Sequence, residues 1–172
     1  KILIEIEKKK PFILYLLKLI NLKNFNKIVL SIGYRKNKLI KFIKQNPKLN
    51  LNYSIEYQLL GTGGAIKNIL KKNKISNPFF VVNGDTFFNF KVSEILRKRK
   101  KNKKKPIIFL KKDEKGKRYD QFKIENKKLI LSTPTNKSNN LISTGFYLFY
   151  KENFKIKKKK IFNRKRYNSQ FS

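Results

Sequence analysis

The segment that determines the architecture of this chain reads Leu60-Gly61-Thr62-Gly63-Gly64-Ala65-Ile66-Lys67-Asn68-Ile69-Leu70. Its three glycines in four positions let the backbone turn sharply and let a ligand come close to main-chain N–H groups. The apolar residues that follow recur at helical spacing, so the turn opens a helix whose N-terminus can face an anion or a polar ring. We therefore expect a glycine-rich turn at residues 61–64 that leads into a helix.

A second motif follows after a short polar link and reads Pro78-Phe79-Phe80-Val81-Val82-Asn83-Gly84-Asp85. The continuous apolar run at residues 79–82 is typical of a strand that is buried on both faces. The residues that end this run place the carboxylate of Asp85 at the C-terminal end of the strand. Open α/β sheets bind ligands and metals at that edge, so the two motifs together predict one ligand site.

The rest of the chain alternates between strand patterns and helix patterns. Strands are expected at residues 27–32, 51–56, 79–82, 106–110, 122–125, 128–131 and 141–149, and residues 1–6 are weakly extended. Helices are expected at residues 11–22, 37–46 and 92–103, in addition to the helix that follows the glycine turn. This order implies right-handed βαβ units and a mostly parallel sheet between layers of helices.

The two motifs resemble those of the sugar-1-phosphate nucleotidyltransferases, and within them the heptose-1-phosphate and mannose-1-phosphate guanylyltransferases. The likeness covers residues 1–149. It implies an α/β fold of the nucleotide-diphospho-sugar transferase type, Rossmann-like, with three layers and a mostly parallel, mixed central sheet. It also implies a reaction in which an NTP, here GTP, and a heptose or mannose 1-phosphate give an NDP-sugar and pyrophosphate. Such a product feeds surface polysaccharide synthesis, as in lipopolysaccharide.

The composition limits the available chemistry. With 172 residues, 40% of them hydrophobic, the chain can bury one substantial core. It contains no cysteine and no histidine, which excludes disulfides, thiolate chemistry and an imidazole base. Catalysis must therefore use carboxylates, lysines, backbone N–H groups and a hard cation. We expect a core at residues 1–150 and a lysine-rich, loosely ordered segment at residues 151–172.

The formal net charge of +34 can indicate a nucleic-acid or acidic membrane partner. The lysines, however, lie in nearly every connector and are not interleaved with aromatic residues, which favours a compositional bias. We expect no specific nucleic acid and no membrane partner, with a basic nucleic-acid-binding module as the alternative. No apolar run reaches the length of a membrane span and no signal peptide is recognisable, so a cytoplasmic location is expected. The sequence is compatible with a homo-oligomer and does not fix the oligomeric state.

Asp85 is the first candidate catalytic residue. Nucleotidyl transfer gathers negative charge between the attacking phosphate oxygen and the leaving pyrophosphate, and a divalent cation held by carboxylates offsets that charge. By resemblance, Asp85 coordinates Mg²⁺. The alternative is an aspartate that ends a strand and caps the next segment.

The nucleotide-binding candidates surround the glycine turn. By resemblance, the turn lies against the base and the ribose through its backbone groups and the Thr62 hydroxyl. Glu56 precedes the turn where relatives place a polar residue near the base, although a surface glutamate at the end of a strand fits equally well. The full predicted set is Glu56, Leu60, Gly61, Thr62, Gly63, Gly64 and Gly84.

Two candidates rest on shorter motifs. Lys1 stands where the family has the lysine of a Lys-Pro-Leu segment that contacts a phosphate, so it is a candidate catalytic residue, but Ile2 replaces the proline. The alternative for Lys1 is a solvent-facing lysine. Arg118-Tyr119 resembles the family's Arg-Tyr-Gly, which makes Tyr119 a candidate sugar-binding residue, although Asp120 replaces the glycine.

Ser143, Thr144 and Gly145 complete the sugar-binding candidates. They resemble a family segment that contacts the sugar hydroxyls. A glycine bend within a core strand explains the same residues without a ligand, because Gly145 allows a close backbone approach.

The sequence departs from the family pattern in three places. The opening Gly-Gly-x-Gly-Thr-Arg loop is not found, residues 133–137 replace a Glu-Lys-Pro segment, and no downstream metal aspartate occurs before Ser172. The chain starts at Lys1 and contains no methionine, so we expect a piece of a longer protein whose core lacks its first strand and phosphate loop. The parent is then an enzyme and this piece alone is inactive. The alternative is a domain that binds a sugar nucleotide without turnover.

Overall fold

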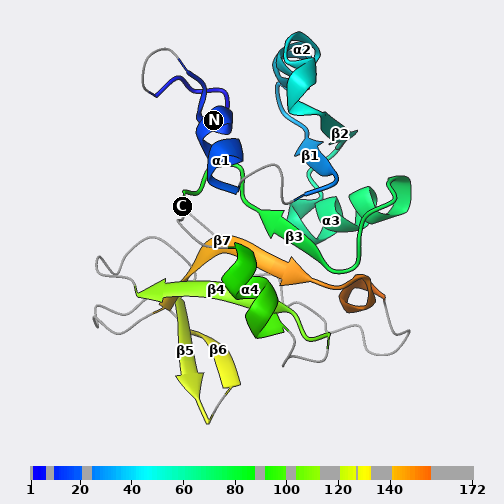
Figure 1. The fold of residues 1–172 in the computed structure, drawn as a ribbon. Coiled ribbons are helices and arrows are strands. Elements are labelled where there is room, and N and C mark those ends of the chain that lie inside the picture. Colours follow the sequence, from blue (N-terminus) through cyan, green and yellow to red (C-terminus); the bar gives the residue numbers. More distant parts are fainter. Residues whose placement is uncertain are drawn as a thin grey trace, which may run out of the picture.

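The computed structural model describes residues 2–6, 10–20, 25–87, 92–99, 104–112, 121–126, 128–132 and 141–155 (Figure 1). The helices are α1 (Phe12–Ile20), α2 (Lys36–Gln45), α3 (Gly61–Lys72) and α4 (Val92–Arg99), with the short 3-10 helices η2 (Pro47–Leu49) and η3 (Lys151–Phe154). The strands are β1 (Ile28–Ile32), β2 (Leu51–Ile55), β3 (Phe79–Val82), β4 (Ile107–Lys112), β5 (Gln121–Glu125), β6 (Lys128–Ser132) and β7 (Leu141–Phe149).

The strands form a parallel pair and an antiparallel sheet. β1 and β2 pair in parallel, with Ile32 opposite Ile55. β7 pairs antiparallel with β3, β4 and β5, and β6 completes the β5–β6 hairpin. The α/β class and the mixed pairing are therefore confirmed. Among the described strands, parallel pairing is confined to β1 and β2. β7 runs in the opposite direction to β3, and each of its own edges is paired with a neighbouring strand.

Residues 2–6, which were expected to be weakly extended, form an isolated bridge and fold back onto the start of α1. The N–H groups of Phe12 and Ile13 donate to the carbonyl oxygens of Ile4 and Ile2 at 2.8 and 2.9 Å, and Glu5 forms an isolated bridge with Pro11. The first turn of a helix has N–H groups without partners inside the helix. Residues 2–6 fold back to satisfy two of those in α1, and this interaction replaces pairing in a sheet.

The core forms where α1 and α2 pack on β1 and β7. Ile13, Leu16, Leu17 and Ile20 recur at the spacing of one helical face, and all four are buried. Leu39 and Ile43 of α2, Ile32 of β1 and Phe146 of β7 belong to the same cluster. Phe146 is 1% exposed, so this side chain of the antiparallel sheet is buried in the core that α1 organises.

The end of β7 is anchored to the start of β3 by polar contacts. The Asn77 Nδ2 donates to the Glu152 Oε2 at 3.1 Å, and the Lys104 Nζ lies 3.3 Å from the Glu152 Oε1. Hydrogen bonds from the backbone of Glu152 and from Asn77 lower the pKa of the Glu152 carboxyl because they favour its charged form. The expected C-terminal segment therefore begins with the ordered η3, and residues 156–172 lie outside the described part.

None of the helices in the described ranges combines the length and the apolar character that a membrane crossing requires.

Replacing Phe146 by alanine tests the role of this side chain in the core. We expect the Phe146→Ala change to lower the free energy of unfolding by about 3–5 kcal/mol, because it removes a buried ring and leaves a cavity. The matched control is Phe87→Ala, since Phe87 is 60% exposed. That change should stay within about 0.5 kcal/mol of the parent chain in urea denaturation. Equal losses of unfolding free energy in both variants would contradict the assignment of Phe146 to the core.

Candidate functional site

The glycine-rich turn is the first turn of α3. Gly61, the first residue of the helix, has φ +64°, a left-handed conformation that favours glycine. The helix therefore starts earlier than the apolar spacing suggested, and Thr62, Gly63 and Gly64 lie inside it. Their N–H groups lie in the first turn of the helix, where N–H groups have no partners within the helix. This places main-chain donors and the positive end of the helix dipole at the predicted ligand-binding edge.

The glycines of this turn differ in what would meet a side chain. A Cβ on Gly64 would lie 2.8 Å from the Leu60 Cβ, so packing against Leu60 requires glycine there. A Cβ on Gly63 would meet nothing within 4 Å, and its φ is not positive. Neither packing nor backbone strain explains glycine at position 63. The open space beside Gly63 leaves room for a ligand to approach the backbone.

The position of α3 on β2 is set by Asn68. Its Nδ2 donates to the Ser54 Oγ at 3.2 Å and to the Ile55 carbonyl oxygen at 3.3 Å. The amide thus joins the middle of α3 to the carboxyl-terminal part of β2. As a consequence, the glycine-rich first turn lies near the end of that strand.

Asp85 follows β3 in a short turn that β7 supports. The Asn83 N–H donates to the Gly145 carbonyl oxygen at 2.9 Å, and the Thr86 N–H donates to the Asn83 carbonyl oxygen at 3.4 Å. Asp85 is exposed at the carboxyl end of β3, as the sequence predicted.

Gly145 of β7 leaves the space that this turn occupies. Its φ is +74°, and a Cβ there would lie 3.0 Å from both Asn83 and Thr86. The close approach of this turn matches the glycine bend that was the alternative for Gly145, and its predicted contact with a sugar stays a prediction. Gly145 therefore positions Asp85 through Asn83.

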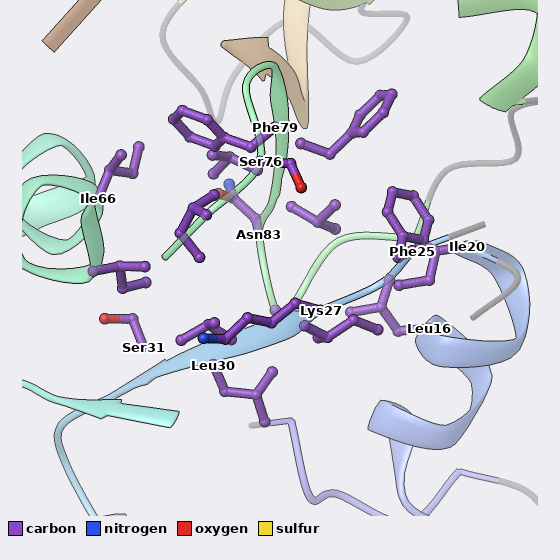
Figure 2. Close-up of a pocket in the computed structure, with 18 of the residues that line it drawn as sticks. Leu16, Ile20, Phe25, Lys27, Leu30, Ser31, Ile66, Ser76, Phe79 and Asn83 are labelled. Atoms are coloured by element: carbon purple, nitrogen blue, oxygen red, sulfur yellow. The ribbon is translucent and has the colours of Figure 1, made fainter. Parts of the chain in front are cut away.

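The two motifs meet at one cavity of about 870 Å³. Thr62 of α3 lines it together with Gly84 and Asp85, and α1, α2, β1, β3 and α4 contribute further residues to its walls. Figure 2 shows Ser31 and Ile66 at one end of the cavity and Leu16, Ile20 and Phe25 at the other. Most of the wall is apolar, and its polar groups include Ser31, Asn83 and Arg99.

Glu56 lies beside this cavity and does not line it. Its carboxylate accepts a hydrogen bond from the Ser31 hydroxyl, and its N–H donates to the Ile32 carbonyl oxygen at 2.7 Å. The side chain thus joins the carboxyl ends of β1 and β2. Ser31 was not among the predicted residues, although its place at the end of an apolar strand is a signal that sequence reasoning could have used.

The predicted sugar-binding residues of β7 face two directions. The Ser143 Oγ and the Tyr147 hydroxyl oxygen lie 2.8 Å apart in a hydrogen bond, and the Gly145 N–H donates to the Ser143 Oγ at 3.2 Å. Thr144 is 1% exposed, and its hydroxyl donates to the Phe109 carbonyl oxygen at 2.9 Å. The Thr144 side chain is thus a structural link between β7 and β4, and this geometry does not offer it to a ligand.

The remaining predicted residues, Lys1 and Tyr119, lie outside the described residues. Leu60 is half-buried and precedes α3, where its side chain packs against Gly64.

Asp85 is the acidic residue in the described wall of this cavity. Within the described ranges, no three side chains of His, Cys, Asp or Glu gather closely enough to hold a metal ion by themselves. Mg²⁺ is commonly held by one or two carboxylates together with substrate phosphates and water. An exposed aspartate in the wall of a cavity that Thr62 also lines fits this second arrangement.

The alternation of β1, α2, β2 and α3 with a glycine turn and a strand-end aspartate defines an α/β protein of the nucleotide-diphospho-sugar transferase type. The chain matches the family model described as nucleotidyl transferase over residues 1–172, and it belongs to that family.

Several curated proteins are similar in sequence to this chain. The chain is 31% identical over 148 residues to D-glycero-alpha-D-manno-heptose 1-phosphate guanylyltransferase of Campylobacter jejuni, which covers 84% of this chain and 64% of the relative. It is 40% identical over 81 residues to the enzyme of the same name from Aneurinibacillus thermoaerophilus, covering 46% of this chain and 34% of the relative.

A solved structure supports the same fold. HddC from Yersinia pseudotuberculosis, complexed with GMP-PN, superposes with a TM-score of 0.70 at 26% identity, over 83% of this chain and 64% of that one. The chain therefore spans about two thirds or less of the length of these proteins.

A pair of glycine substitutions tests how the site is supported. We expect Gly145→Ala to lower the free energy of unfolding by about 1–3 kcal/mol, because alanine is strained at positive φ and crowds Asn83. Gly63→Ala should leave stability unchanged or raise it by up to about 1 kcal/mol, because alanine favours the helix and nothing opposes its Cβ. Thermal unfolding of both variants measures the difference. A destabilised Gly63→Ala chain would show that packing requires this glycine.

Proposed function

We propose that this chain is the nucleotide-binding core of a sugar-1-phosphate nucleotidyltransferase that uses GTP and a heptose or mannose 1-phosphate. One observation carries the proposal: Thr62 of the glycine-rich turn and Asp85 of the strand-end turn line the same cavity. The guanylyltransferase names of the relatives support the choice of base and sugar. Membership of the nucleotidyl transferase family supports the class of reaction.

In this reaction, an oxygen of the sugar phosphate forms a bond to the α-phosphorus of the NTP. The bond from that phosphorus to the bridging oxygen breaks, and pyrophosphate leaves with the electron pair. Holding the two substrates in line supplies most of the rate, since no covalent intermediate with the protein is needed. Mg²⁺, when bound, offsets the charge of the phosphates.

The chain's own residues orient the nucleotide. The N–H groups in the first turn of α3 and the Thr62 hydroxyl face the ligand, and the missing side chain of Gly63 lets the base and ribose approach the backbone. Asp85 would hold the divalent cation, which would bind the phosphates of the NTP. Glu56 sets the edge of the site by joining Ser31 to the end of β2, which is a positioning role.

We further propose that turnover requires parts of the longer protein. The chain covers 64% of the length of the Campylobacter jejuni relative, and the sequence lacks the family's triphosphate loop. The 172-residue chain then binds GTP and releases no pyrophosphate. A longer protein that also binds a sugar nucleotide but releases no pyrophosphate would favour the non-catalytic alternative.

Calorimetry with GTP tests the role assigned to Asp85. We expect Mg²⁺ to tighten GTP binding to the parent chain. We expect Asp85→Asn to lower the affinity for GTP in the presence of Mg²⁺ about tenfold, which corresponds to about 1.4 kcal/mol. The control is Glu94→Gln on α4, which removes another exposed carboxylate away from the cavity wall. Loss of the Mg²⁺ effect in both variants would contradict a specific role for Asp85, because general charge would then explain it.

The Gly63→Ala variant tests the contact between nucleotide and turn. We expect its affinity for GTP to fall about tenfold or more while its unfolding temperature is kept, because the new methyl group occupies the space of the ligand. The comparison ligands are ATP and UTP at the same salt concentration. Unchanged GTP binding by Gly63→Ala would place the nucleotide elsewhere. Equal binding of all three nucleotides that vanishes with salt would indicate attraction to net charge alone.

A further inference from the structure

The loops that follow β1 and β2 carry tyrosines at matching positions. Ile32 lies opposite Ile55 as the last pair of the parallel register, and the Glu56 N–H donates to the Ile32 carbonyl oxygen at 2.7 Å. Tyr34 and Tyr57 each stand two residues beyond that pair. Because parallel strands present their carboxyl ends at the same edge, both tyrosines belong to one edge of the β1–β2 pair (Figure 1).

Both tyrosines are exposed, and each ring has a cation over it. Tyr34 is 87% exposed and Tyr57 is 80% exposed. The Arg35 Cζ lies 5.2 Å from the centre of the Tyr34 ring, and the Lys36 Nζ lies 5.0 Å from the centre of the Tyr57 ring. Both distances are within the range of cation–π attraction. Because Lys36 follows β1 and Tyr57 follows β2, these four residues form one patch, called the tyrosine surface below.

Arg35 has a backbone conformation that an arginine rarely adopts. Its φ is +56°, in the left-handed region that glycine and asparagine favour. The residue is exposed, so packing in the core does not require an arginine at this position. Strained residues of this kind are most frequent at functional sites. The strain therefore indicates that the guanidinium over Tyr34 has a use that outweighs its cost in stability.

A small cavity of about 270 Å³ adjoins the tyrosine surface at Tyr57. Its volume is several times the roughly 30 Å³ that a water molecule occupies in the liquid, so it has room for an organic group. The described wall combines two tyrosines with a lysine and contains no acidic residue. It consists of Tyr53, Ser54, Ile55, Tyr57, Lys72 and Asn73. Its rings and its cation match a ligand that is both planar and negatively charged.

Charge narrows the choice of partner. Residues 33–60 carry six basic side chains and one acidic side chain, that of Glu56, whose carboxylate accepts a hydrogen bond from the Ser31 hydroxyl. A second copy of this chain, with a formal net charge of +34, would be repelled. An acidic polypeptide would supply negative charge but few planar groups. A single-stranded nucleic acid supplies both, because its phosphates attract lysine and arginine and its unpaired bases stack on aromatic rings.

We propose that the tyrosine surface binds single-stranded nucleic acid without selecting a base sequence. Bases stack on the open faces of Tyr34 and Tyr57, and phosphates pair with Arg35, Lys36 and Lys72. The basic and aromatic residues are not interleaved along the sequence, but the pairing of β1 with β2 brings them together. The proposal holds whether or not the protein binds GTP, because none of these five residues lines the cavity that Thr62 and Asp85 share.

Fluorescence anisotropy with two labelled probes tests this proposal. One probe is a mixed-sequence single strand of about 12 nucleotides, a length within the range that one binding domain covers. The other is an abasic strand of the same length and charge, so attraction to net charge contributes equally to both. At about 0.3 M salt, where that attraction is weakened, we expect the strand with bases to bind about tenfold or more tightly than the abasic strand.

Substitutions separate stacking from charge. Tyr34→Ala combined with Tyr57→Ala should remove the difference between the probes, whereas the paired Tyr→Phe changes should keep it, because the rings remain. Arg35→Gly should reduce the difference and raise the unfolding temperature, because glycine is relaxed at this φ. The matched control is Lys44→Ala with Lys48→Ala, at the other end of α2. It should weaken both probes by the same factor, and thermal unfolding verifies that every variant is folded.

Four results would overturn the proposal. The first is equal affinity of the parent chain for the two probes, which would indicate attraction to charge alone. The second is a difference between the probes that survives in the chain without both tyrosine rings. The third is displacement of the strand with bases by GTP and Mg²⁺, because the strand would then occupy the nucleotide cavity. The fourth is binding of polyglutamate that depends equally on the two tyrosines, because the surface would then suit an acidic polypeptide.

Discussion

The hydrogen bond from the Asn83 N–H to the Gly145 carbonyl oxygen, 2.9 Å long, is the contact on which the candidate site depends. It sets the end of β3 against the middle of β7, and the left-handed Gly145 leaves space for the turn that carries Asp85. The next residue of β7, Phe146, is buried in the core that α1 and α2 build. The position of one exposed carboxylate is thus tied through Gly145 and Phe146 to the hydrophobic core.

A second constraint brings the glycine-rich turn to the same place. Asn68 ties α3 to the end of β2, and Ser31 and Glu56 tie the end of β2 to the end of β1. Polar groups at the ends of strands therefore hold the rim, while apolar side chains of the helices form the cavity wall. This division suits the proposed nucleotide site, which would present N–H groups and a carboxylate to a charged ligand without burying them.

Local features of the sequence predicted much of this arrangement. The apolar run at residues 79–82 and the breaks around it predicted β3 with its observed bounds, and Asp85 stands at the expected end. Thr62 and Asp85 share a cavity, as the two motifs indicated, because the carboxyl ends of neighbouring α/β units meet at one edge.

What the sequence could not predict depends on contacts between distant residues. The pairing of β7 with three strands is non-local, so no window of the sequence contains it. Strand periodicity shows that Ser143 and Thr144 face opposite sides, but not that Thr144 is the one that is buried. Residues 2–6 looked extended, and their actual role is to satisfy N–H groups of α1, which becomes visible only once that helix exists.

The most direct test of the account is paramagnetic broadening of backbone amide resonances by Mn²⁺ in the presence of GTP. The account predicts that substoichiometric Mn²⁺ broadens the amide of Asp85, and that adding GTP extends the broadening to Thr62 and Gly63 across the cavity. Broadening that leaves out Asp85, or that GTP never extends to the first turn of α3, would contradict a shared site for the metal and the nucleotide.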